Sequence, residues 1–411
     1  MSTPAASRAH PAALALLIVP YGASGGFVTV GLAFIATQHG LSITQGALLG
    51  GASLAAQWLR WLWAPLVDIT LTPQRWYFLA NGVVALTGVA MAAVPMTPAT
   101  LPFLLALIGA SGIAASILAM AVECVMAACT VPEQIGRMSA WQQAGNLGGT
   151  GLGGGLGLYL LEHLPSPWMA GAIMSSLMLA CGLAWRYVVA PPPDRTGTRA
   201  KASVLVVARD LWALMRTRGG MMAAVLLMLP LGTGAAAGVL TQATVAAMWH
   251  AGASEVALTQ GVFSGVLTAA GCFAGGWLCH RMQPRMAYVV VGLLLAIVDL
   301  AMVFAPTTLT VYIGISLVYA FGVGIAYAAY TAVVLDSIGT GSAATKFSVM
   351  ASLANFPIWW MGLLLGWVAD VRDPMAMLQT EALFTVLALG VFAGAMAWAR
   401  RTPRLVGQLQ V

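Results

Sequence analysis

The stretch AALALLIVPYGASGGFVTVGLAFIAT, residues 12–37, contains no charged side chain from one end to the other. A helix needs about 20 consecutive apolar residues to cross a ~30 Å hydrocarbon core, and this stretch is long enough. The apolar core of a secretory signal peptide is shorter, about 7–15 residues, and is followed by a cleavage site of small residues. No clear cleavage site follows here, so we expect these residues to form the first membrane-spanning helix.

The whole chain has the composition of a membrane protein. Of its 411 residues, 60% are hydrophobic and 7% are charged, whereas soluble domains carry about 25% charged residues. Most of the surface must therefore face lipid. The hydropathy pattern predicts an all-α protein with twelve spanning segments, at residues 12–38, 43–66, 76–95, 99–128, 137–162, 167–189, 218–246, 256–280, 285–304, 308–336, 343–369 and 376–399.

A polar stretch divides these segments into two groups of six. It begins with Pro191-Pro192-Pro193-Asp194-Arg195 and reaches Arg218. We therefore expect an N-terminal six-helix bundle at residues 1–189, a cytoplasmic linker at 190–217 and a C-terminal six-helix bundle at 218–411.

The lysines and arginines predict the orientation, because cationic loops are retained on the cytoplasmic side of the membrane. Arg60 falls inside a span and Arg372 lies on the opposite side. The other sixteen of the eighteen share one side, namely Arg8, Arg75, Arg137, Arg186, Arg195, Arg199, Lys201, Arg209, Arg216, Arg218, Arg281, Arg285, Lys346, Arg400, Arg401 and Arg404. We expect a multi-pass inner-membrane protein with both termini in the cytoplasm. The net charge of +6 then reflects topology and indicates no nucleic-acid partner.

The two halves also contain a weak internal repeat. Arg137, Asn146 and Gly157 have the same spacing as Lys346, Asn355 and Gly366, at a constant offset of 209 residues. Transporters are commonly built from repeats that rock around a central site. We expect Asn146 and Asn355 to face each other across a pseudo-twofold axis.

Cofactor and metal motifs are missing from the sequence. The five cysteines are dispersed within apolar stretches, which is typical of small buried residues, and no metal site is expected. The glycine-rich run from Gly145 to Gly157 lacks the Lys-Ser/Thr ending of a phosphate-binding loop. Close helix packing explains it better. A proton gradient is then the default energy source.

Short motifs indicate the class of protein. Ala64-Pro65-Leu66-Val67-Asp68 precedes Arg75, and Gly275-Gly276-Trp277-Leu278-Cys279-His280-Arg281 precedes Arg285. These stretches resemble the loop signature of the major facilitator superfamily, in which an acid and a base lock the cytoplasmic gate. His280 stands where the family usually has Asp, which weakens that lock or makes it depend on pH.

Four further stretches resemble the branch that contains the AmpG muropeptide permease, the acetyl-coenzyme A transporters and the RhtX and FptX siderophore permeases. They are residues 21–26 (YGASGG), 60–68 (RWLWAPLVD), 132–137 (PEQIGR) and the pair 344–347 (ATKF) with 352–355 (SLAN). The resemblance implies a monomeric transporter of a small organic substrate. Asp68, Arg75 and Arg137 would close its cytoplasmic gate, and a basic residue would occupy the position of Arg60.

Charged residues inside the predicted spans are functional candidates, because each costs at least ~2.5 kcal/mol in a bilayer. Arg60 and Glu123 lie at similar depths and could form a pair that is released by a proton or an anionic substrate, or a fixed pair that only joins two helices. We expect Asp299 to be a water-facing helix end. Asp336 should cap or gate beside Lys346.

Uncharged polar residues predict the substrate cavity, because placed hydrogen-bonding groups within aromatic walls suit a small organic ligand. On the tenth helix, Tyr319, Tyr327 and Tyr330 share a face. On the fifth, Gln142, Gln143 and Asn146 lie together, and their face continues to Gly149 and Gly153. Gln242, Asn355, Trp359 and Trp360 extend the set.

These observations favour proton-coupled import of an organic solute. By resemblance the solute is a muropeptide or related sugar-peptide, and the alternative is a siderophore or its iron complex. A membrane-embedded enzyme would need clustered acids or histidines, and these are dispersed. A sensor or scaffold would be expected to carry longer tails or a soluble domain.

Overall fold

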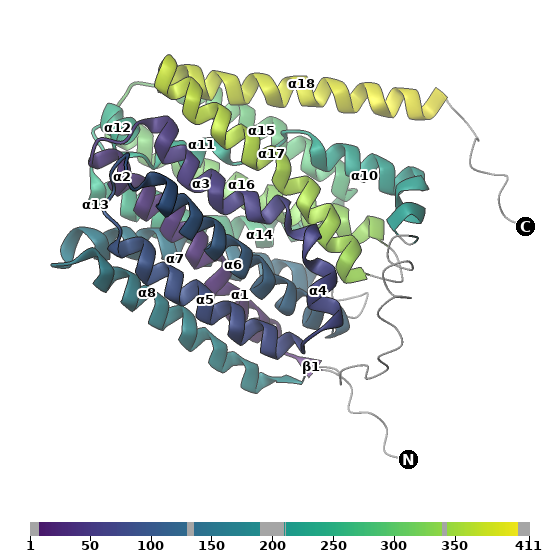
Figure 1. Ribbon diagram of the computed structural model, residues 1–411. Helices are drawn as coiled ribbons and strands as arrows, with labels where there is room; N and C mark the ends of the chain where they lie inside the picture. Colours follow the sequence, from purple (N-terminus) through teal and green to yellow (C-terminus); the bar gives the residue numbers. More distant parts are fainter. Residues whose placement is uncertain (1–7, 130–134, 190–208, 210, 339–342, 402–411) are drawn as a thin grey trace, which may run out of the picture.

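Long helices that run roughly parallel dominate the computed structural model of the chain (Figure 1). The structure describes residues 8–129, 135–189, 209, 211–338 and 343–401. Most of the predicted linker at 190–217 lies outside this range, as do Arg404 and half of the 132–137 motif.

The first half of the described chain holds β1 (Arg8–Ala9), α1 (Pro11–Gly26), η1 (Phe27–Leu32), α2 (Ala33–Gln38), α3 (Ile43–Trp58), η2 (Arg60–Leu62), α4 (Ala64–Ile69), α5 (Pro73–Ala93), α6 (Leu101–Cys129), α7 (Ile135–His163), α8 (Pro167–Cys181), η4 (Gly182–Tyr187) and β2 (Val188–Val189). The second half holds α10 (Arg218–Met228), α11 (Ala235–Leu240), α12 (Ala243–Ala246), η5 (Ala247–Trp249), α13 (Ala253–Val256), η6 (Ala257–Phe263), α14 (Ser264–Arg281), α15 (Pro284–Phe304), α16 (Leu309–Ile338), α17 (Ala343–Val371) and α18 (Pro374–Arg401).

Local sequence signals explain where many of these helices begin. Proline stands in the first turn of α1, α5, α8 and α15, where its missing N–H would have no helical partner in any case. Ser42 caps α3 in a capping box: its hydroxyl accepts from the Gln45 amide at 3.2 Å, and the Gln45 side chain accepts from the Ser42 amide at 2.9 Å.

Nine helical stretches in the described part of the chain are long and apolar enough to cross a membrane. The other three predicted segments, 43–66, 137–162 and 218–246, also contain helices. The first and last of them are interrupted by turns, and α7 is rich in glycine. The structure thus confirms the prediction of a multi-pass helical protein, and the number of twelve spans remains a prediction.

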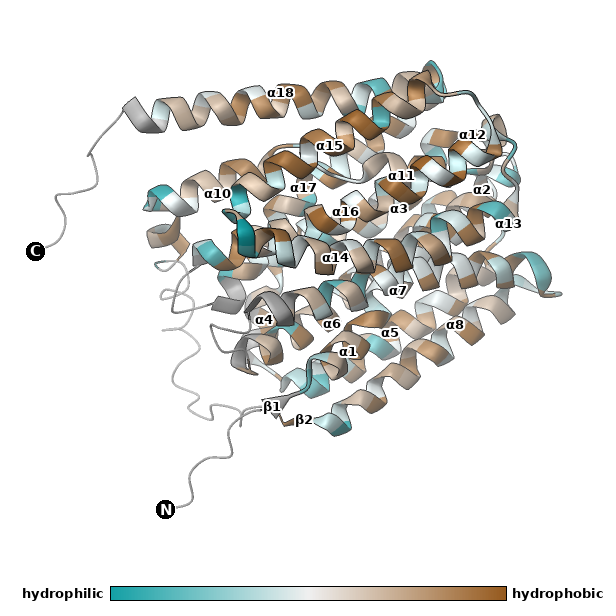
Figure 2. Cartoon of the chain, turned by 180° about the vertical axis from the view of Figure 1, so that it is seen from behind, coloured by the Kyte–Doolittle hydropathy of each residue, from teal (hydrophilic) through white to brown (hydrophobic). Residues whose placement is uncertain are grey.

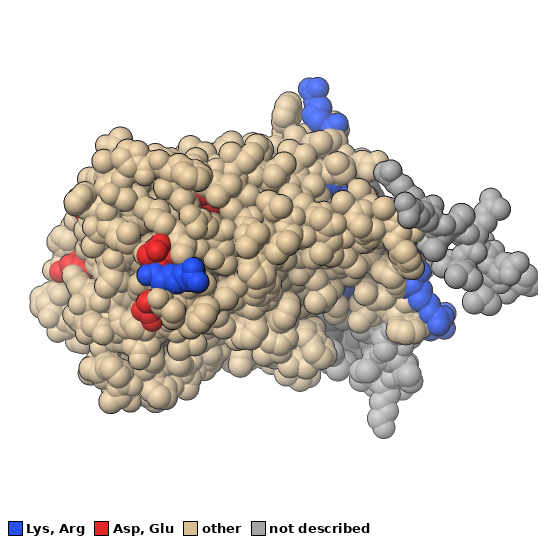
Figure 3. Space-filling view, turned by 90° about the horizontal axis from the view of Figure 1, so that it is seen from above, with Lys and Arg blue, Asp and Glu red and all other residues tan. Residues whose placement is uncertain are grey.

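The charges and polar side chains support a membrane setting. Figure 2 shows hydrophilic residues concentrated toward the two ends of the bundle, and Figure 3 shows a broad, almost uncharged belt between them. We call these the β1 end, where α14 ends and α15 begins, and the α12 end, where α17 ends and α18 begins. Arg281 and Arg285 lie at the β1 end, and Arg372 lies at the α12 end.

Small residues allow the helices to approach closely. A Cβ atom placed on Gly22 of α1 would lie only 1.8 Å from the Asn146 carbonyl oxygen of α7, and one on Gly153 of α7 would lie 2.1 Å from the Ala23 carbonyl oxygen. Because these neighbours are backbone atoms, they cannot move aside as a side chain could. The glycine run therefore serves helix packing, as the sequence indicates.

The two halves meet through equivalent helices. In the first half, α7 packs on α1 and also contacts α14 and η6 of the second half. In the second half, α17 packs on α11 and also contacts α3 of the first half. In each half, one helix thus packs within its own half and also contacts the other half. This is the arrangement expected of two related units around a central axis.

The seventh predicted span is not one continuous helix. α10 ends at Met228, and the chain leaves helical geometry through Leu229-Pro230-Leu231-Gly232-Thr233-Gly234 before α11 begins. Pro230 disfavours helical geometry at the preceding residue. Gly232 and Gly234 have φ of 58° and 69°, a conformation that glycine adopts without a steric penalty. We call residues 229–234 the helix break.

A short strand pair departs from the all-α expectation. Arg8 pairs with Val189 and Ala9 with Val188, in antiparallel register. This pair joins the start of α1 to the end of the first half, and the bundle is otherwise helical.

Candidate functional site

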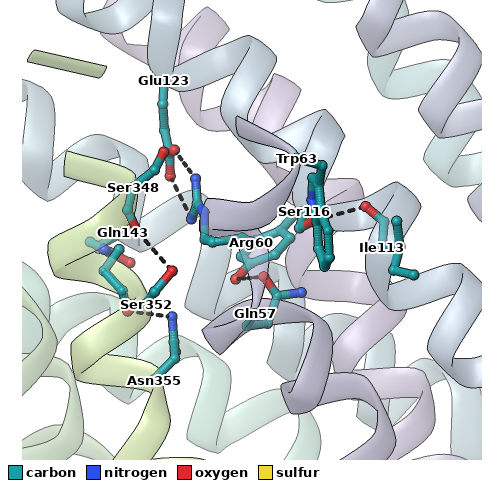
Figure 4. A network of polar contacts seen from close by, with 12 residues as sticks. Gln57, Arg60, Trp63, Ile113, Ser116, Glu123, Gln143, Ser348, Ser352 and Asn355 are labelled. Atoms are coloured by element: carbon teal, nitrogen blue, oxygen red, sulfur yellow. Dashed lines mark hydrogen bonds and ion pairs between the residues drawn. The ribbon is translucent and has the colours of Figure 1, made fainter. Parts of the chain in front are cut away.

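A buried ion pair joins two helices of the first half. Helix α3 ends at Trp58, and the 3-10 turn η2 begins at Arg60. Arg60 is only 2% exposed. Pro65 near the start of α4 lacks the N–H that would continue a single helix through this point. Both guanidinium Nη atoms of Arg60 donate to the two carboxylate oxygens of Glu123 on α6, and the Nη1–Oε1 distance is 3.3 Å (Figure 4). The predicted meeting of these two residues is therefore observed.

Hydrogen bonds next to the pair join α1 to α3, and the residue after η2 to α6. Tyr21 of α1 donates its hydroxyl proton to the Gln57 side-chain oxygen at 3.0 Å. Trp63 donates its indole N–H to Ser116 at 2.8 Å. Arg60 Nε has no hydrogen-bond partner among the described residues. The guanidinium thus retains one donor that a ligand or water could use.

A second polar layer connects the two halves. Gln143 of α7 donates to the Thr331 hydroxyl at 3.0 Å and to the Tyr330 hydroxyl at 3.4 Å, both on α16. Asn146 donates to the Gln143 side-chain oxygen at 3.1 Å. The predicted residues Gln143, Asn146 and Tyr330 therefore form one network.

Other residues of the predicted face on α7 lie elsewhere. Gly149 and Gly153 pack against the backbone of α1 and are not among the residues that line the central cavity. Gln142 is buried, and its side-chain oxygen has no hydrogen-bond partner among the described residues. The spacing of these residues did not reveal which side of α7 faces α1, because glycine and glutamine carry no clear preference for either surface.

A cavity of about 230 Å³ lies between the two halves. Two of the predicted residues, Tyr327 and Trp359, line it. Every side chain of its lining is uncharged. The polar members of the lining are Thr29, Thr150, Thr233, Thr241, Gln260, Ser264, Thr268, Tyr327 and Trp359.

The sequence analysis missed most of this lining. A single threonine or glutamine in an apolar helix gives little signal, because a hydroxyl can bond the carbonyl one turn back in its own helix. Thr29 does so, donating to the Gly25 carbonyl at 3.0 Å. The break that exposes Thr233 could be anticipated from Pro230 and the two following glycines.

Aromatic rings separate the cavity from the ion pair. Trp359 of α17 packs on Trp58 of α3, with ring centroids 5.4 Å apart. Phe356 of α17 also packs on Trp58, again with ring centroids 5.4 Å apart. Trp58 precedes Arg60 by two residues. Trp359 of the cavity wall is thus in contact with the residue two positions before Arg60.

Asn355 lies beside the cavity rather than in its main lining. It borders a small neighbouring space with Tyr327 and Tyr330, and its amide donates to the Ala351 carbonyl at 2.9 Å. Asn146 and Asn355 thus both approach Tyr330 and its neighbours, but no hydrogen bond joins the two. Their expected equivalence across an axis remains a prediction.

The α12 end is closed by contacts between the halves. Thr44 donates its hydroxyl proton to the Asp370 carboxylate at 2.7 Å. Thr241 donates to the Thr29 carbonyl at 3.0 Å, and the Ala243 amide donates to the Thr37 hydroxyl at 2.9 Å. Sequence analysis did not identify this closing layer.

The predicted cytoplasmic gate is described only in part. The side chains of Asp68 and Arg137 lie outside the described residues, and Arg75 is exposed at the start of α5. Asp336 forms an ion pair with Arg285 at 3.8 Å. Lys346 is buried. The roles of these five residues as a gate remain predictions.

One expectation about the acids is wrong. Asp299, predicted to be a water-facing helix end, is only 3% exposed. Its position near the end of α15 suggests water, but α15 packs against α18 there, and that neighbour covers it. Glu381 of α18 is equally buried at 3% exposure. Sequence analysis did not single out Glu381, although it lies within the predicted span 376–399.

Comparison with known proteins agrees with this architecture. The family profile of the Major Facilitator Superfamily matches residues 13–362, and the chain belongs to this superfamily. A search of curated proteins gave no match. The protein is therefore a multi-pass membrane transporter of the secondary, small-molecule class, to which the paired halves and central cavity also conform.

Proposed function

We propose that this transporter imports an organic solute across the inner membrane by proton-coupled alternating access, as a monomer with both termini in the cytoplasm. The observation that carries the proposal is the buried Arg60–Glu123 pair. Arg60 lies two residues beyond Trp58, whose ring packs on Trp359 of the cavity wall. An arginine and a glutamate taken out of water offset each other's desolvation cost only while they remain paired.

The pair can couple proton and solute because each competes with one member of the pair. The proton competes with Arg60 for Glu123, and an anionic group of the solute competes with Glu123 for Arg60. Protonation of Glu123 removes the negative charge that holds Arg60, and the freed guanidinium then attracts an anionic group of the solute. Loss of the proton restores the pair and expels that group. The alternative is a fixed pair that only joins α3, α4 and α6.

The cavity favours a solute with neutral polar groups. Small and apolar residues make up most of its lining, a few hydroxyl, amide and aromatic side chains interrupt them, and none of the lining residues is charged. Its volume of about 230 Å³ is below the roughly 300–1,000 Å³ of most ligand pockets. The halves must separate further to admit a large solute.

The proposed substrate is an anhydro-muropeptide or related sugar-peptide, with a siderophore or its iron complex as the alternative. Both rest on the resemblance of the four sequence stretches. A sugar ring suits the threonine and aromatic lining, and the carboxylate of a peptide suits Arg60. Siderophores also carry many oxygen groups, so uptake must distinguish the two.

The test is uptake of labelled anhydro-muropeptide into proteoliposomes that contain the purified protein, with and without an imposed proton gradient. We expect accumulation above equilibrium only with the gradient. Absence of uptake by protein shown to be folded would reject this substrate, and the labelled siderophore would then be measured in the same vesicles.

The role of Glu123 is tested by Glu123→Gln in the same vesicles, with the exposed Glu162→Gln as matched control. We expect Glu123→Gln to lose gradient-driven accumulation but to retain exchange of substrate across the membrane. The control should behave as the unaltered protein. Gradient-driven uptake by Glu123→Gln would exclude a coupling role and leave the fixed pair.

A further inference from the structure

Two buried acids of the second half lie beside the helix break. Glu381 extends from α18 about 10 Å from the start of that helix, by the 1.5 Å rise per residue. Asp299 extends from α15, and the charges of the two carboxyl groups interact. The two helices pack together at the outer side of the second half (Figure 1).

Glu381 accepts four hydrogen bonds, which occupy both of its oxygens. Oε1 accepts from the Thr233 hydroxyl at 2.6 Å and from the Ala235 amide at 3.2 Å. Oε2 accepts from the Ala236 amide at 3.2 Å and from the Tyr319 hydroxyl at 3.0 Å. A carboxyl group that only accepts is ionised. The two amides can only donate, so this arrangement favours the ionised form of Glu381.

Asp299 has the opposite environment. It is 3% exposed and forms no hydrogen bond with any residue that the structure describes. No described lysine or arginine pairs with either acid. Two like charges in one buried site cannot both remain ionised at an acceptable cost. Because Glu381 has all the donors, the shared proton belongs on Asp299.

Glu381 also holds the helix break in place. Three of the four groups that donate to it are the Thr233 hydroxyl within the break and the first two amides of α11. One turn farther along α18, Thr385 donates to the Pro230 carbonyl at 3.4 Å. Thr233 and Ala235 also line the central cavity, so the carboxylate lies directly behind the cavity wall.

We propose that Glu381 and Asp299 form a proton-binding site that controls the helix break and, through it, the wall of the central cavity. When a second proton binds to an oxygen of Glu381, that oxygen gains an O–H bond and becomes a donor. A hydroxyl such as that of Thr233 can turn and accept instead. The Ala235 and Ala236 amides cannot, and a neutral carboxyl group accepts more weakly than a carboxylate, so the attachment of α11 to α18 weakens.

The weakening of this attachment reaches the α12 end. α11 is followed by Thr241 and Ala243, which hold the first half through Thr29 and Thr37. Among the groups that face Glu381, α15 contributes Asp299 and α16 contributes Tyr319, while α11 contributes backbone amides. α10 and α17 also contact α18, but no titratable side chain of theirs interacts with Glu381.

The test is hydrogen exchange, measured by mass spectrometry on peptides that cover residues 233–242 of the full-length protein in nanodiscs. Exchange is measured at several pH values and corrected for the intrinsic pH dependence of amide exchange. We expect protection to fall about tenfold as the pH is lowered, because charge-assisted bonds to two amides are lost. This measurement needs no substrate, so its failure is distinct from failure of the proposed transport.

Three variants make the result specific. Glu381→Gln should show low protection at every pH. Asp299→Asn should keep the transition at about the same pH, because the acid that it replaces is already neutral when Glu381 takes up its proton. Glu162→Gln should match the unaltered protein. The Asp299→Asn arm remains informative if Glu381→Gln fails to fold.

Two outcomes would overturn the inference. One is protection of residues 233–242 that does not change with pH in the unaltered protein. The other is protection that follows the sodium concentration at constant pH and not the proton concentration, which would make the acids a cation site.

Discussion

Substitution of Gly151 by alanine should open the α12 end of the protein. Gly151 lies on α7 where the first half meets the second. A Cβ atom at this position would be 2.3 Å from Gly265 Cα and 2.6 Å from the Gly261 carbonyl oxygen. Ordinary carbon contacts are about 3.5–4.0 Å, so the halves must separate by about 1 Å here.

We expect the cost of this clash to fall on the conformation in which α7 contacts Gly261 and Gly265, as it does here. Overpacking costs about 1–3 kcal/mol, and about 2 kcal/mol corresponds to roughly a 30-fold change in an equilibrium. The matched control is Gly148→Ala, on the same helix, whose Cβ would make only an ordinary 3.9 Å contact with Ala269. Both variants change helix propensity equally.

Opening is measured with a reporter cysteine at Gly50, which lines the cavity. A Cβ there would approach only Thr29, at 3.5 Å. The native cysteines are replaced by serine, and a membrane-impermeant maleimide is added to spheroplasts and to inverted vesicles, so that the α12 end is reached in one of them. We expect labelling through that end to be up to about 30-fold faster in Gly151→Ala than in Gly148→Ala. Equal rates in both preparations would refute the reasoning.

Two further predictions concern stability, measured by unfolding of the purified protein. Arg60→Gln or Glu123→Gln alone should each lower the free energy of unfolding by about 3–5 kcal/mol, because the remaining charge is buried without its partner. The double variant should be more stable than the sum of the two single effects predicts. Simple additivity would show that the pair contributes nothing as a pair. Gly234→Ala should lower the unfolding temperature, since its φ of 69° costs an L-residue about 1–2 kcal/mol. Gly238→Ala, in the neighbouring α11 with open space around it, should not, and an equal loss in both would contradict the assignment to backbone strain.

The spans of the helices could be predicted from sequence because lipid imposes a local rule. A backbone in the bilayer must satisfy its own hydrogen bonds, so an apolar stretch of sufficient length becomes a helix. The predicted segment 285–304 corresponds to α15 at Pro284–Phe304, and 167–189 corresponds to α8 and η4, which together end at Tyr187. Membership of the superfamily followed from the motifs of the loops and is shown by the family match.

The residues of the site could be predicted only where burying a charged side chain in the membrane is energetically costly, because such residues stand out in an apolar sequence. Arg60 and Glu123 are charges in apolar runs, and their similar depth suggested that they meet. Thr29, Thr150 and Gln260, which line the cavity, carry no such cost, and so nothing in the sequence distinguishes them from other polar residues that bond within their own helix.

The sequence by itself determined the membrane class, the positions of the helices and the asymmetry of charge, because each depends on residues that are neighbours along the chain. The tertiary structure decided which side chains share a site. Glu381 reaches Thr233 across 148 positions and Gln143 reaches Thr331 across 188. Such pairs depend on the rotation and packing of helices far apart in sequence, which the hydropathy of each helix leaves open because lipid satisfies every apolar face equally well.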